Sequence, residues 1–442
     1  MKVRIEKLDH FGRGITYIDG KVCFVEHALP NEIVELEIVK ETKKFILGKA
    51  TDYLEASPDR EIEKCKYFNV CGGCNLEHYN YVKENEYKQE KVKELITKFA
   101  KLDIKVNDII YDTEKNYRNK ITLHGKDKKL GLYKKETNDL IEITSCNLVD
   151  KRINDIIPLL QELATDNDIE EVIIRVSNDS EKLMVKIKGE VSNINSLKDI
   201  DVLIINDKVL TNSNRIITSI GSKKYYVSVD SFFQVNKTLT TKLYDEVKNI
   251  VEEVKPNRVL DLYCGTGTIG IYVSEHTNEV IGVDYSKSNI EDANKNKELN
   301  DIKNITFIND KVENVIDSFE SNIDLIIVDP PRAGLDLKTI EHLKRINPAT
   351  IIYVSCDPST LARDLKELSN DYNVKYVQPF NMFPRTYHVE CVSLLERKWF
   401  VKETHDDRAE EILNKSWIKI TLFDCIYKNS MIYFNYINYL AI

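Results

Sequence analysis

No stretch of this chain is apolar and long enough to cross a membrane, and the first ten residues, MKVRIEKLDH, lack the apolar segment of a secretory signal. We therefore expect a cytoplasmic protein that makes no membrane contact. Cysteine usage points to the same reducing compartment. The nine cysteines are an odd number in a long chain, which argues against the disulfide framework of small secreted proteins.

The chain also lacks an excess of positive charge. Its 63 Lys and Arg are outnumbered by 72 Asp and Glu, so the net charge is −9. This balance gives no support to nucleic-acid binding, but it does not exclude it, because a local basic face is sufficient. The composition, with 42% hydrophobic and 31% charged residues, predicts a globular protein, and 442 residues suffice for roughly two to four domains.

The first half of the chain predicts two regions. Residues 1–57 alternate apolar and polar side chains in short segments broken by Gly and Pro, which predicts a small closed β-barrel. Residues 58–220 begin with a cysteine-rich segment, continue with a charged helix over 80–101 and contain a hairpin that turns at 178–180. We expect this central region to be a mixed α+β domain.

The pattern changes over residues 221–396, which contain seven apolar strand candidates. The earlier ones are separated by amphipathic helices, which predicts a mainly parallel sheet covered on both faces and closed by an antiparallel pair. The predicted fold class is therefore α/β. Residues 397–442 are aromatic and apolar without a clear period, and the sequence assigns them no role.

A glycine-rich turn follows the first of these strands. The segment VLDLYCGTGTIG places Asp261 at a strand end and then Gly265, Gly267 and Gly270 in the spacing G-x-G-x-x-G. The glycines allow a tight turn and close approach of a nucleotide to the backbone, and dinucleotide sites share this spacing. A carboxylate only four positions before the first glycine favours the positive methionine end of S-adenosylmethionine (SAM) over a pyrophosphate.

The next two strands also end in carboxylates. Asp284 is placed to bind the ribose hydroxyls, and Asp310 is placed to accept a hydrogen bond from the adenine amine. Because ligands in such sheets lie at the carboxyl ends of the strands, we expect these side chains to converge with Asp261. The sequence therefore predicts a SAM site.

The fourth and fifth strands end in Asp329-Pro330-Pro331 and in Cys356. In such a fold we expect both strands to flank the first one and to face the methyl donor. The prolines form a rigid ledge for a planar base, which an amino-group methyltransferase could also use. Alone, a buried cysteine is usually packing. Inside a SAM site, its thiolate can add to C6 of uracil and turn C5 into a nucleophile, after which a base must remove the C5 proton.

A cysteine cluster lies near the start of the central region. CKYFNVCGGC contains Cys65, Cys71 and Cys74, and Cys146 is a candidate fourth ligand. Thiols at this density predict a metal site, and zinc and an iron–sulfur cluster both accept four thiolates. A radical-SAM enzyme uses a different cysteine spacing and leaves one iron open, whereas Cys146 would close this site.

Together, the segments FFQVN, DPPRAG, YVSCDPSTLARD and FNMFPRTYHVECVSLL resemble the RNA uracil-5-methyltransferase family, of the 23S ribosomal RNA type, and the resemblance covers about residues 1–396. It implies that Cys356 is the nucleophile and Glu390 the base. The SAM contacts that it implies are Gln234, Tyr263, Asp284, Asp310 and Asp329. The family often has Glu at position 284 and Asn at position 268, where this chain has Asp284 and Thr268, and either change could alter the affinity for the donor.

The same resemblance implies two further features. The four cysteines are expected to hold a structural [4Fe-4S] cluster, and the barrel, through its segment DHFGRGI, is expected to be an RNA-binding TRAM domain. The segment NYRNKITLHG offers Tyr117, Arg118 and Lys120 to stack on bases and bind phosphates.

The predicted function is SAM-dependent formation of 5-methyluridine in RNA by a monomeric enzyme, with 23S ribosomal RNA as the substrate. A tRNA T-loop enzyme is the alternative within the same chemistry, although its relatives usually lack both the barrel and the cysteine cluster. A non-catalytic RNA-binding or assembly protein is the alternative from another class. The presence of Cys356, Glu390 and the glycine turn argues against it.

Overall fold

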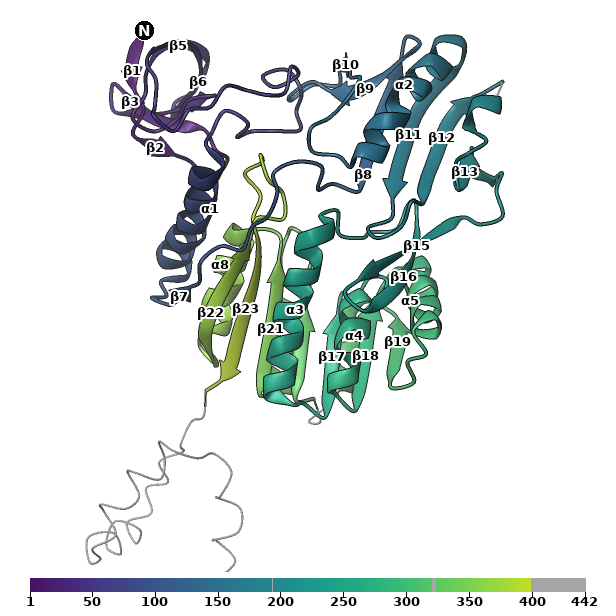
Figure 1. Ribbon diagram of the computed structural model, residues 1–442. Helices are drawn as coiled ribbons and strands as arrows, with labels where there is room; N and C mark the ends of the chain where they lie inside the picture. Colours follow the sequence, from purple (N-terminus) through teal and green to yellow (C-terminus); the bar gives the residue numbers. More distant parts are fainter. Residues whose placement is uncertain (193, 320–322, 399–442) are drawn as a thin grey trace, which may run out of the picture. The chain divides into compact units, whose positions relative to one another are not determined.

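A computed structural model of the chain describes residues 1–192, 194–319 and 323–398. Met1–Arg397 form one compact unit, in which the described strands build four sheets (Figure 1). The C-terminal extension predicted from residue 397 lies outside the described residues, apart from its first two positions. Across the described ranges, no helix is at once long and apolar enough to cross a membrane.

The first sheet has six strands in the order β1-β5-β6-β4-β3-β2, and all its pairs are antiparallel except β4 with β6. Its strands are β1 (Lys2–Arg4), β2 (Lys7–Leu8), β3 (Gly14–Ile18), β4 (Lys21–Glu26), β5 (Ile33–Glu41) and β6 (Phe45–Glu55). Only Ile5 and Glu6 separate the two outermost strands, so the chain itself joins both edges and the sheet closes. The predicted barrel is therefore present.

The predicted charged helix follows the cysteine-rich segment. It is α1 (Tyr81–Leu95), and the side chain of Asn80 caps it by accepting hydrogen bonds from two N–H groups of its first turn. The chain continues through a π-helical turn, Ile96–Ala100. Val92 and Leu95 are buried in the core of the C-terminal sheet, so this helix packs on a part of the chain that is distant in sequence.

The central sheet has seven strands in the order β10-β9-β8-β11-β12-β13-β14. Its strands are β8 (Lys120–Lys126), β9 (Lys129–Tyr133), β10 (Leu140–Glu142), β11 (Asp168–Val176), β12 (Leu183–Glu190), β13 (Val202–Ile205) and β14 (Lys208–Val209). The antiparallel pair β11–β12 is the predicted hairpin. Helix α2 (Lys151–Asp166) buries Ile153, Ile157 and Leu160 against this sheet. A two-stranded sheet, β15 (Arg215–Ile220) and β16 (Lys223–Ser228), comes next.

The C-terminal sheet has eight strands in the order β19-β18-β17-β20-β21-β23-β22-β7. The strands are β7 (Lys105–Val106), β17 (Arg258–Leu262), β18 (Glu279–Asp284), β19 (Ile305–Asn309), β20 (Leu325–Val328), β21 (Thr350–Ser355), β22 (Tyr372–Phe380) and β23 (Glu390–Arg397). The strands from β19 to β21 are parallel, and β22 and β23 form the predicted antiparallel pair. All seven predicted strands are present, while the short edge strand β7 was not predicted.

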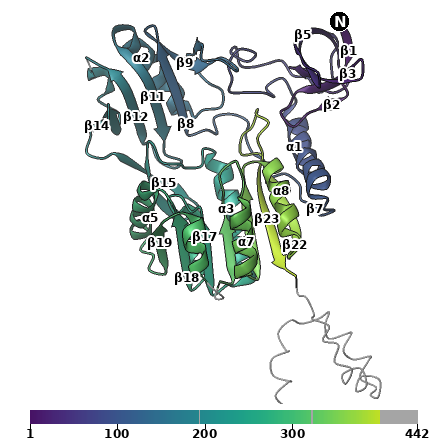
Figure 2. The same cartoon turned by 180° about the vertical axis from the view of Figure 1, so that it is seen from behind.

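Helices cover both faces of this sheet (Figures 1 and 2). They are α3 (Lys237–Val254), α4 (Thr268–Val273), α5 (Lys287–Leu299), α6 (Val312–Val315), α7 (Leu337–Ile346) and α8 (Pro358–Leu368). Neighbouring strand residues enter different cores: Ile327 packs with α3 and α4, and Ile326 packs with α7 and α8. Because both faces are buried, the strands read as continuous apolar runs, as the sequence indicated.

One expectation about strand order was wrong. We expected the fourth and fifth predicted strands both to flank the first, but only β20 pairs with β17, and β21 lies beyond β20. Sheet order depends on which faces the connecting helices cover, and strand sequences do not encode it. Cys356 therefore stands one strand farther from the glycine turn than expected.

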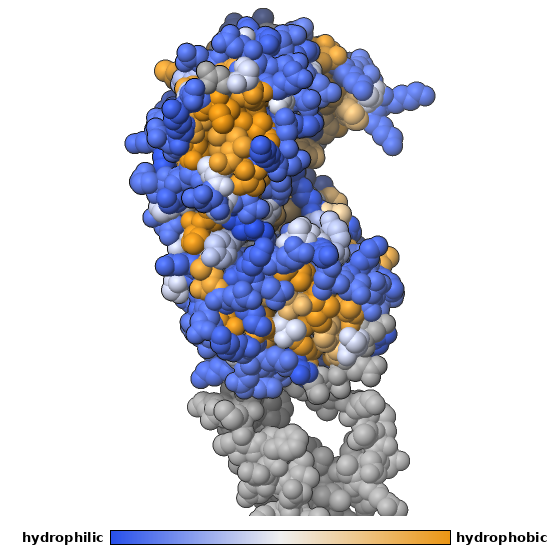
Figure 3. Space-filling model, turned by 90° about the vertical axis from the view of Figure 1, so that its right-hand side faces the viewer, coloured by the Kyte–Doolittle hydropathy of each residue, from blue (hydrophilic) through white to orange (hydrophobic). Residues whose placement is uncertain are grey.

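The surface of the described residues is mainly hydrophilic on the face that Figure 3 presents, with apolar side chains gathered in two separate areas. Several aromatic side chains are largely exposed, among them Phe232 (69%), Tyr285 (74%) and Phe11 (53%). Exposed rings of this size offer flat surfaces to which planar ligands can bind.

Candidate active site and cysteine cavity

The glycine turn lies between the end of β17 and the start of α4. Gly265 (φ +54°) and Gly267 (φ +76°) both adopt left-handed backbone conformations. A Cβ on Gly267 would meet Phe307 Cζ at 2.5 Å, whereas a Cβ on Gly265 would meet nothing within 4 Å. Packing therefore requires Gly267, and Gly265 leaves open space for a ligand. Tyr263 is also left-handed (φ +63°), a strained conformation for a side chain of its size.

A pocket beside this turn brings together five of the residues predicted to bind SAM. Asp261 and Asp329 come from the neighbouring strand ends, Tyr263 and Gly265 come from the turn, and Gln234 comes from the segment before α3. The pocket is also lined by Phe232, Phe233, Tyr244 and Thr268. None of these four side chains was predicted to contact SAM. Tyr244 bonds to Thr268, with 2.8 Å between the hydroxyl oxygens.

One carboxylate oxygen of Asp261 accepts no hydrogen bond from any residue that the structure describes. The residue is fully buried, and its Oδ2 accepts a hydrogen bond of 2.9 Å from the N–H of Gly270. Among the described residues, Oδ1 has no partner. Burial, reinforced by the neighbouring Asp329 and Asp284, raises the pKa of Asp261 to about 8. Since a buried acceptor without a donor is costly, this position fits the ammonium group of SAM.

Asp284 and Asp310 occupy adjacent strand ends but lie outside this pocket. Asp284 Oδ2 accepts from the N–H of Gly265 at 3.0 Å, so Asp284 positions the open side of the glycine turn. Asp310 Oδ1 accepts from the N–H of Lys311 and from Asn314 Nδ2, both at 2.7 Å, within its own turn. We expected the three carboxylates to converge on one point. They instead lie in a row along the edge of the sheet.

Cys356 and Glu390 stand opposite each other. Ser355 of β21 pairs with Cys391 of β23, so the next step of the antiparallel register places Cys356 across from Glu390. Glu390 is 3% exposed, and burial followed by the charge of Asp329 raises its pKa to about 8. Burial, Glu390 and Asp329 together raise the pKa of the Cys356 thiol to about 12. Asp329, which lines the pocket beside the glycine turn, is close enough to both groups for its charge to raise their pKa values.

Arg332 is a residue of this region to which the sequence analysis assigned no role. It follows the two prolines of DPPRAG, it is exposed, and it forms no ion pair with any residue that the structure describes. Its positive charge opposes the rise in the pKa values of both Glu390 and Cys356. The signal available in the sequence was the position of this arginine in DPPRAG, three residues after Asp329.

The segment before Glu390 is held by Arg385. Its carbonyl oxygen accepts hydrogen bonds from the N–H groups of Asn75 (2.9 Å) and Leu76 (3.0 Å), directly after Cys74 in the chain. The guanidinium is 3% exposed and forms ion pairs with Glu114 and Glu84, among others. The cysteine-rich segment is thereby attached to the loop that leads to Glu390.

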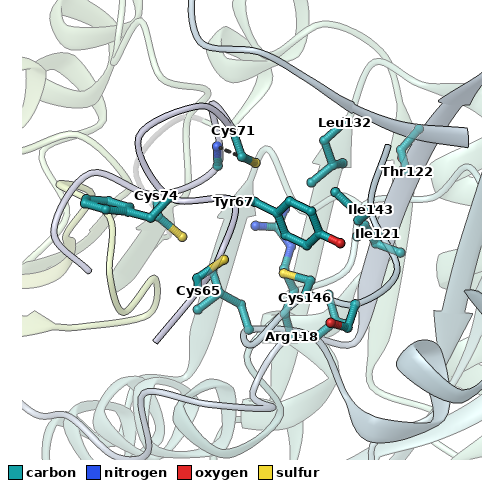
Figure 4. A pocket seen from close by; sticks show the side chains of 15 residues that line it. Cys65, Tyr67, Cys71, Cys74, Arg118, Ile121, Thr122, Leu132, Ile143 and Cys146 are labelled. Atoms are coloured by element: carbon teal, nitrogen blue, oxygen red, sulfur yellow. Dashed lines mark hydrogen bonds between the residues drawn. The ribbon is translucent and has the colours of Figure 1, made fainter. Parts of the chain in front are cut away.

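The four predicted metal ligands line one cavity of about 260 Å³, and all four are free thiols (Figure 4). Cys65, Cys71 and Cys74 come from one loop, and Cys146 comes from the segment before α2. The N–H of Cys146 donates to Asn154 Oδ1 at 2.8 Å, which anchors that segment to the helix. The structure therefore places these cysteines, which are distant in sequence, around one cavity.

The four thiols do not close around a single point. Within the described ranges, no three His, Cys, Asp or Glu side chains are arranged to hold one metal ion. Zinc needs its thiolates about 2.3 Å from one centre. The described residues show no such centre.

This arrangement defines a class of protein. A doubly wound sheet with a glycine turn, a buried carboxylate aimed into the pocket and a second carboxylate at the neighbouring strand end is a SAM-dependent methyltransferase domain. Here it follows a β-barrel and an α+β domain.

Comparisons with known proteins identify the family. Residues 183–398 match the tRNA (Uracil-5-)-methyltransferase family, and residues 1–51 match the TRAM domain. An uncharacterized RNA methyltransferase of Clostridium acetobutylicum is 33% identical over 90% of this chain and 96% of its own length. One from Halalkalibacterium halodurans is 31% identical over 90% and 97%. The chain belongs to the RNA uracil-5-methyltransferase family.

A solved structure is similar over most of the chain. It is the Pyrococcus abyssi tRNA (uracil-54, C5)-methyltransferase in complex with S-adenosyl-L-homocysteine, with 27% identity and a TM-score of 0.74. The similarity covers 89% of this chain and all of that one.

The unused oxygen of Asp261 leads to a prediction about donor binding. SAM affinity should increase as pH rises from 6 to 8, because the ammonium binds the carboxylate and a proton competes for it below the pKa. Asp261→Asn, whose amide oxygen can still accept from Gly270, should weaken binding about 10- to 100-fold at pH 8 and reduce the pH dependence to what Asp329, with a pKa of about 7, contributes. Calorimetric titration at several pH values measures both.

Asp310→Asn is the matched control, since its side chain is bonded within its own turn. It should leave the pH dependence of SAM binding unchanged. Equal loss of pH dependence in both variants would contradict the role assigned to Asp261.

Proposed function

We propose that this enzyme methylates C5 of a uridine in 23S ribosomal RNA through a covalent adduct on Cys356. The observation that supports the proposal most is the register that sets Cys356 opposite Glu390, near Asp329 of the pocket proposed for the donor. The predicted contacts Gln234, Tyr263, Asp261, Gly265, Gly267, Asp284, Asp310 and Asp329 are proposed to bind or to shape the site of the donor.

Each residue has a chemical task in this proposal. The Cys356 thiolate adds to C6, and the electron pair of the C5=C6 bond makes C5 the nucleophile. Bound SAM supplies the methyl group, and S-adenosylhomocysteine leaves. Glu390 takes the C5 proton, the electrons re-form C5=C6, and the Cys356 sulfur departs as thiolate. A pKa near 8 gives Glu390 the proton affinity that a base needs at neutral pH.

The thiol of Cys356 must lose its proton before it can add. The protein alone holds its pKa near 12, and the positive charge of Arg332 opposes this rise. A cationic donor bound in the adjacent pocket would lower this pKa further, because a positive charge stabilises the thiolate. Nucleophile activation is thus proposed to require the bound donor.

A tRNA is the second candidate substrate. We expected the barrel to distinguish the two, but the similarity to the Pyrococcus abyssi tRNA enzyme covers 89% of this chain, so most of it, and not only the catalytic domain, resembles a tRNA enzyme. Support for ribosomal RNA therefore rests on the resemblance of the sequence motifs and on the cysteine cavity. A non-catalytic role fits poorly with a buried carboxyl set opposite a thiol.

Mass spectrometry of cellular RNA tests the proposal. Digests of 23S ribosomal RNA from cells that lack the gene should lose 5-methyluridine, and expression of the gene should restore it. Loss of 5-methyluridine from tRNA alone would show that tRNA, the second candidate, is the substrate. Unchanged 5-methyluridine in both RNA classes would contradict the enzymatic function.

We also propose that Cys65, Cys71, Cys74 and Cys146 hold a [4Fe-4S] cluster with a structural role, in a monomeric cytoplasmic protein. Protein purified without oxygen should be brown and contain roughly four irons per chain. Cys146→Ser should lose most of the iron, because the ligand from the second segment is gone. Cys23→Ala, which alters a cysteine in the barrel core, should keep it. Stoichiometric zinc without iron would contradict the cluster.

A further inference from the structure

Three aromatic side chains connect the barrel to the segment before Glu390. Phe11, in the loop between β2 and β3, contacts Tyr387 edge to face, with 5.3 Å between ring centroids. Tyr387 lies 4.2 Å from the ring of His388, at an interplanar angle of 37°. We call Phe11, Tyr387 and His388 the aromatic row. Since His388 is two residues from Glu390, the row ends beside the proposed catalytic pair.

The loop that carries Phe11 is rigid, although the ring remains exposed. Asp9 Oδ1 accepts from the N–H groups of Phe11 (2.9 Å) and Arg13 (2.8 Å), and Asp9 Oδ2 accepts from Arg13 Nε (2.8 Å). Gly12 (φ +78°) packs so closely that a Cβ would meet Leu76 Cδ2 at 2.9 Å. Phe11 is nevertheless 53% exposed. A preorganised, exposed ring is suited to binding a flat ligand at low entropic cost.

Cationic groups accompany the row at the barrel end. The guanidinium of Arg13 lies 5.2 Å from the ring centroid of Phe11 and 4.5 Å from that of Phe24. Lys91 Nζ lies 5.3 Å from the ring centroid of Tyr387 and donates to its carbonyl oxygen at 2.8 Å. Arg13 pairs with Asp9 at 2.6 Å and Lys91 is 6% exposed, so these two cations hold the rings in place and neither is a free charge for RNA.

At the catalytic end, the exposed Arg332 is near enough to affect the pKa values of both His388 and Cys356. The row is therefore bounded by Arg13 on one side and Arg332 on the other. Aromatic rings between cationic side chains are the composition of surfaces that bind single-stranded nucleic acid.

We propose that the aromatic row is a stacking platform for the single-stranded RNA next to the target uridine, so that the substrate strand runs from the barrel to Cys356. Bases stack on Phe11 and on the Tyr387–His388 pair, while Arg332 contacts a phosphate. The inference rests on the proposed function, because Cys356 marks the position of the target base.

The reaction itself requires such a platform. A target base must leave its stack to reach Cys356, and its neighbours lose a stacking partner when it does. Protein rings beside the catalytic pair replace that partner and hold the strand open. Every base offers a flat face, so the platform binds RNA with little preference for sequence, while duplex RNA offers it no free face.

The test measures RNA binding apart from chemistry. The full-length Cys356→Ala protein, saturated with S-adenosylhomocysteine, is titrated into a labelled single-stranded RNA of about twelve nucleotides with one central uridine. Phe11→Leu in this background keeps an apolar contact with Tyr387 but removes the ring, and should weaken binding about tenfold. Arg332→Gln should lower the slope of log K against log salt by about one.

Tyr17→Leu is the matched control, since Tyr17 is a 56% exposed aromatic residue on the same barrel and outside the row. It should bind the RNA as the parent protein does. A 2-aminopurine placed beside the uridine should be quenched on binding the parent protein, and much less quenched with Phe11→Leu.

Unchanged affinity and quenching in Phe11→Leu would overturn the proposal, and so would equally tight binding of a blunt duplex of the same sequence. A loss of S-adenosylhomocysteine affinity as large as the loss of RNA affinity would also overturn it, by showing that Phe11 only holds the barrel in place. These binding outcomes do not depend on whether methyl transfer occurs. Turnover by Cys356→Ala would instead reject the proposed function and leave the binding result standing.

Discussion

Cys356→Ala is expected to abolish methyl transfer, while Glu390→Gln accumulates a covalent protein–RNA complex. Without the thiol, C5 of uracil is a poor nucleophile, so no methyl group moves. With the thiol but without the base, addition and methyl transfer proceed, and the adduct then stalls because the C5 proton cannot leave. The stalled complex should survive denaturing electrophoresis and carry label from methyl-labelled SAM.

The two variants thus fail at different steps, which is a sharper result than loss of activity in both. Wild type should show little of the labelled complex, and Cys356→Ala should show none. Cys391→Ala is the matched control, because this neighbouring thiol is fully buried in the core beneath the sheet. It should retain turnover in the folded protein. Near-normal turnover by Cys356→Ala would contradict the covalent mechanism.

Arg385→Met is expected to reduce the free energy of unfolding by about 3–5 kcal/mol, the usual cost of removing one partner from a buried ionic cluster. Arg385 is 3% exposed, and without it the fully buried Glu84 would retain one buried cationic partner, Lys88, at 2.7 Å. The N–H of Arg385 donates to Glu84 Oε1 at 3.0 Å, and its guanidinium donates to the carbonyl oxygens of Leu76 and Tyr79. Urea unfolding followed by circular dichroism measures the change.

Two comparison variants sharpen this prediction. Arg385→Lys keeps the positive charge but loses the planar guanidinium group, so it should be destabilised less than Arg385→Met. Arg258→Met removes a partly exposed surface pair with Glu279 and should cost under about 1 kcal/mol. If Arg385→Met cost no more than Arg258→Met, the ionic cluster would contribute nothing to holding the cysteine-rich segment on the loop before Glu390.

Much of the fold could be predicted because its signals are local. Apolar runs such as DLIIV and TIIYVS predict strands buried on both faces, and both are strands in the structure. The glycines at 265 and 267 predict a turn between strand and helix, and both adopt the left-handed backbone that glycine tolerates. Carboxylates and a thiol directly after strands predict a ligand site at one sheet edge, because the carboxyl ends of parallel strands share that edge.

Several features of the site could not be predicted, because they depend on how strands are ordered and how side chains turn. Strand order placed Cys356 beyond β20 rather than beside β17. The carboxylate of Asp310 accepts its hydrogen bonds within its own turn, and no strand pattern predicts this. The roles of Arg332 and Tyr244 depend on neighbours that come from other elements.

The sequence by itself therefore determined the strands, the glycine turn and the family, because each is written in a few adjacent residues. The tertiary structure alone decided which of these meet. The pairing of Cys356 with Glu390, the attachment of the cysteine-rich segment to Arg385 and the contact of Phe11 with Tyr387 join positions far apart in the chain. Such contacts follow from the packing of whole elements, and packing depends on the complete set of buried faces rather than on any local pattern.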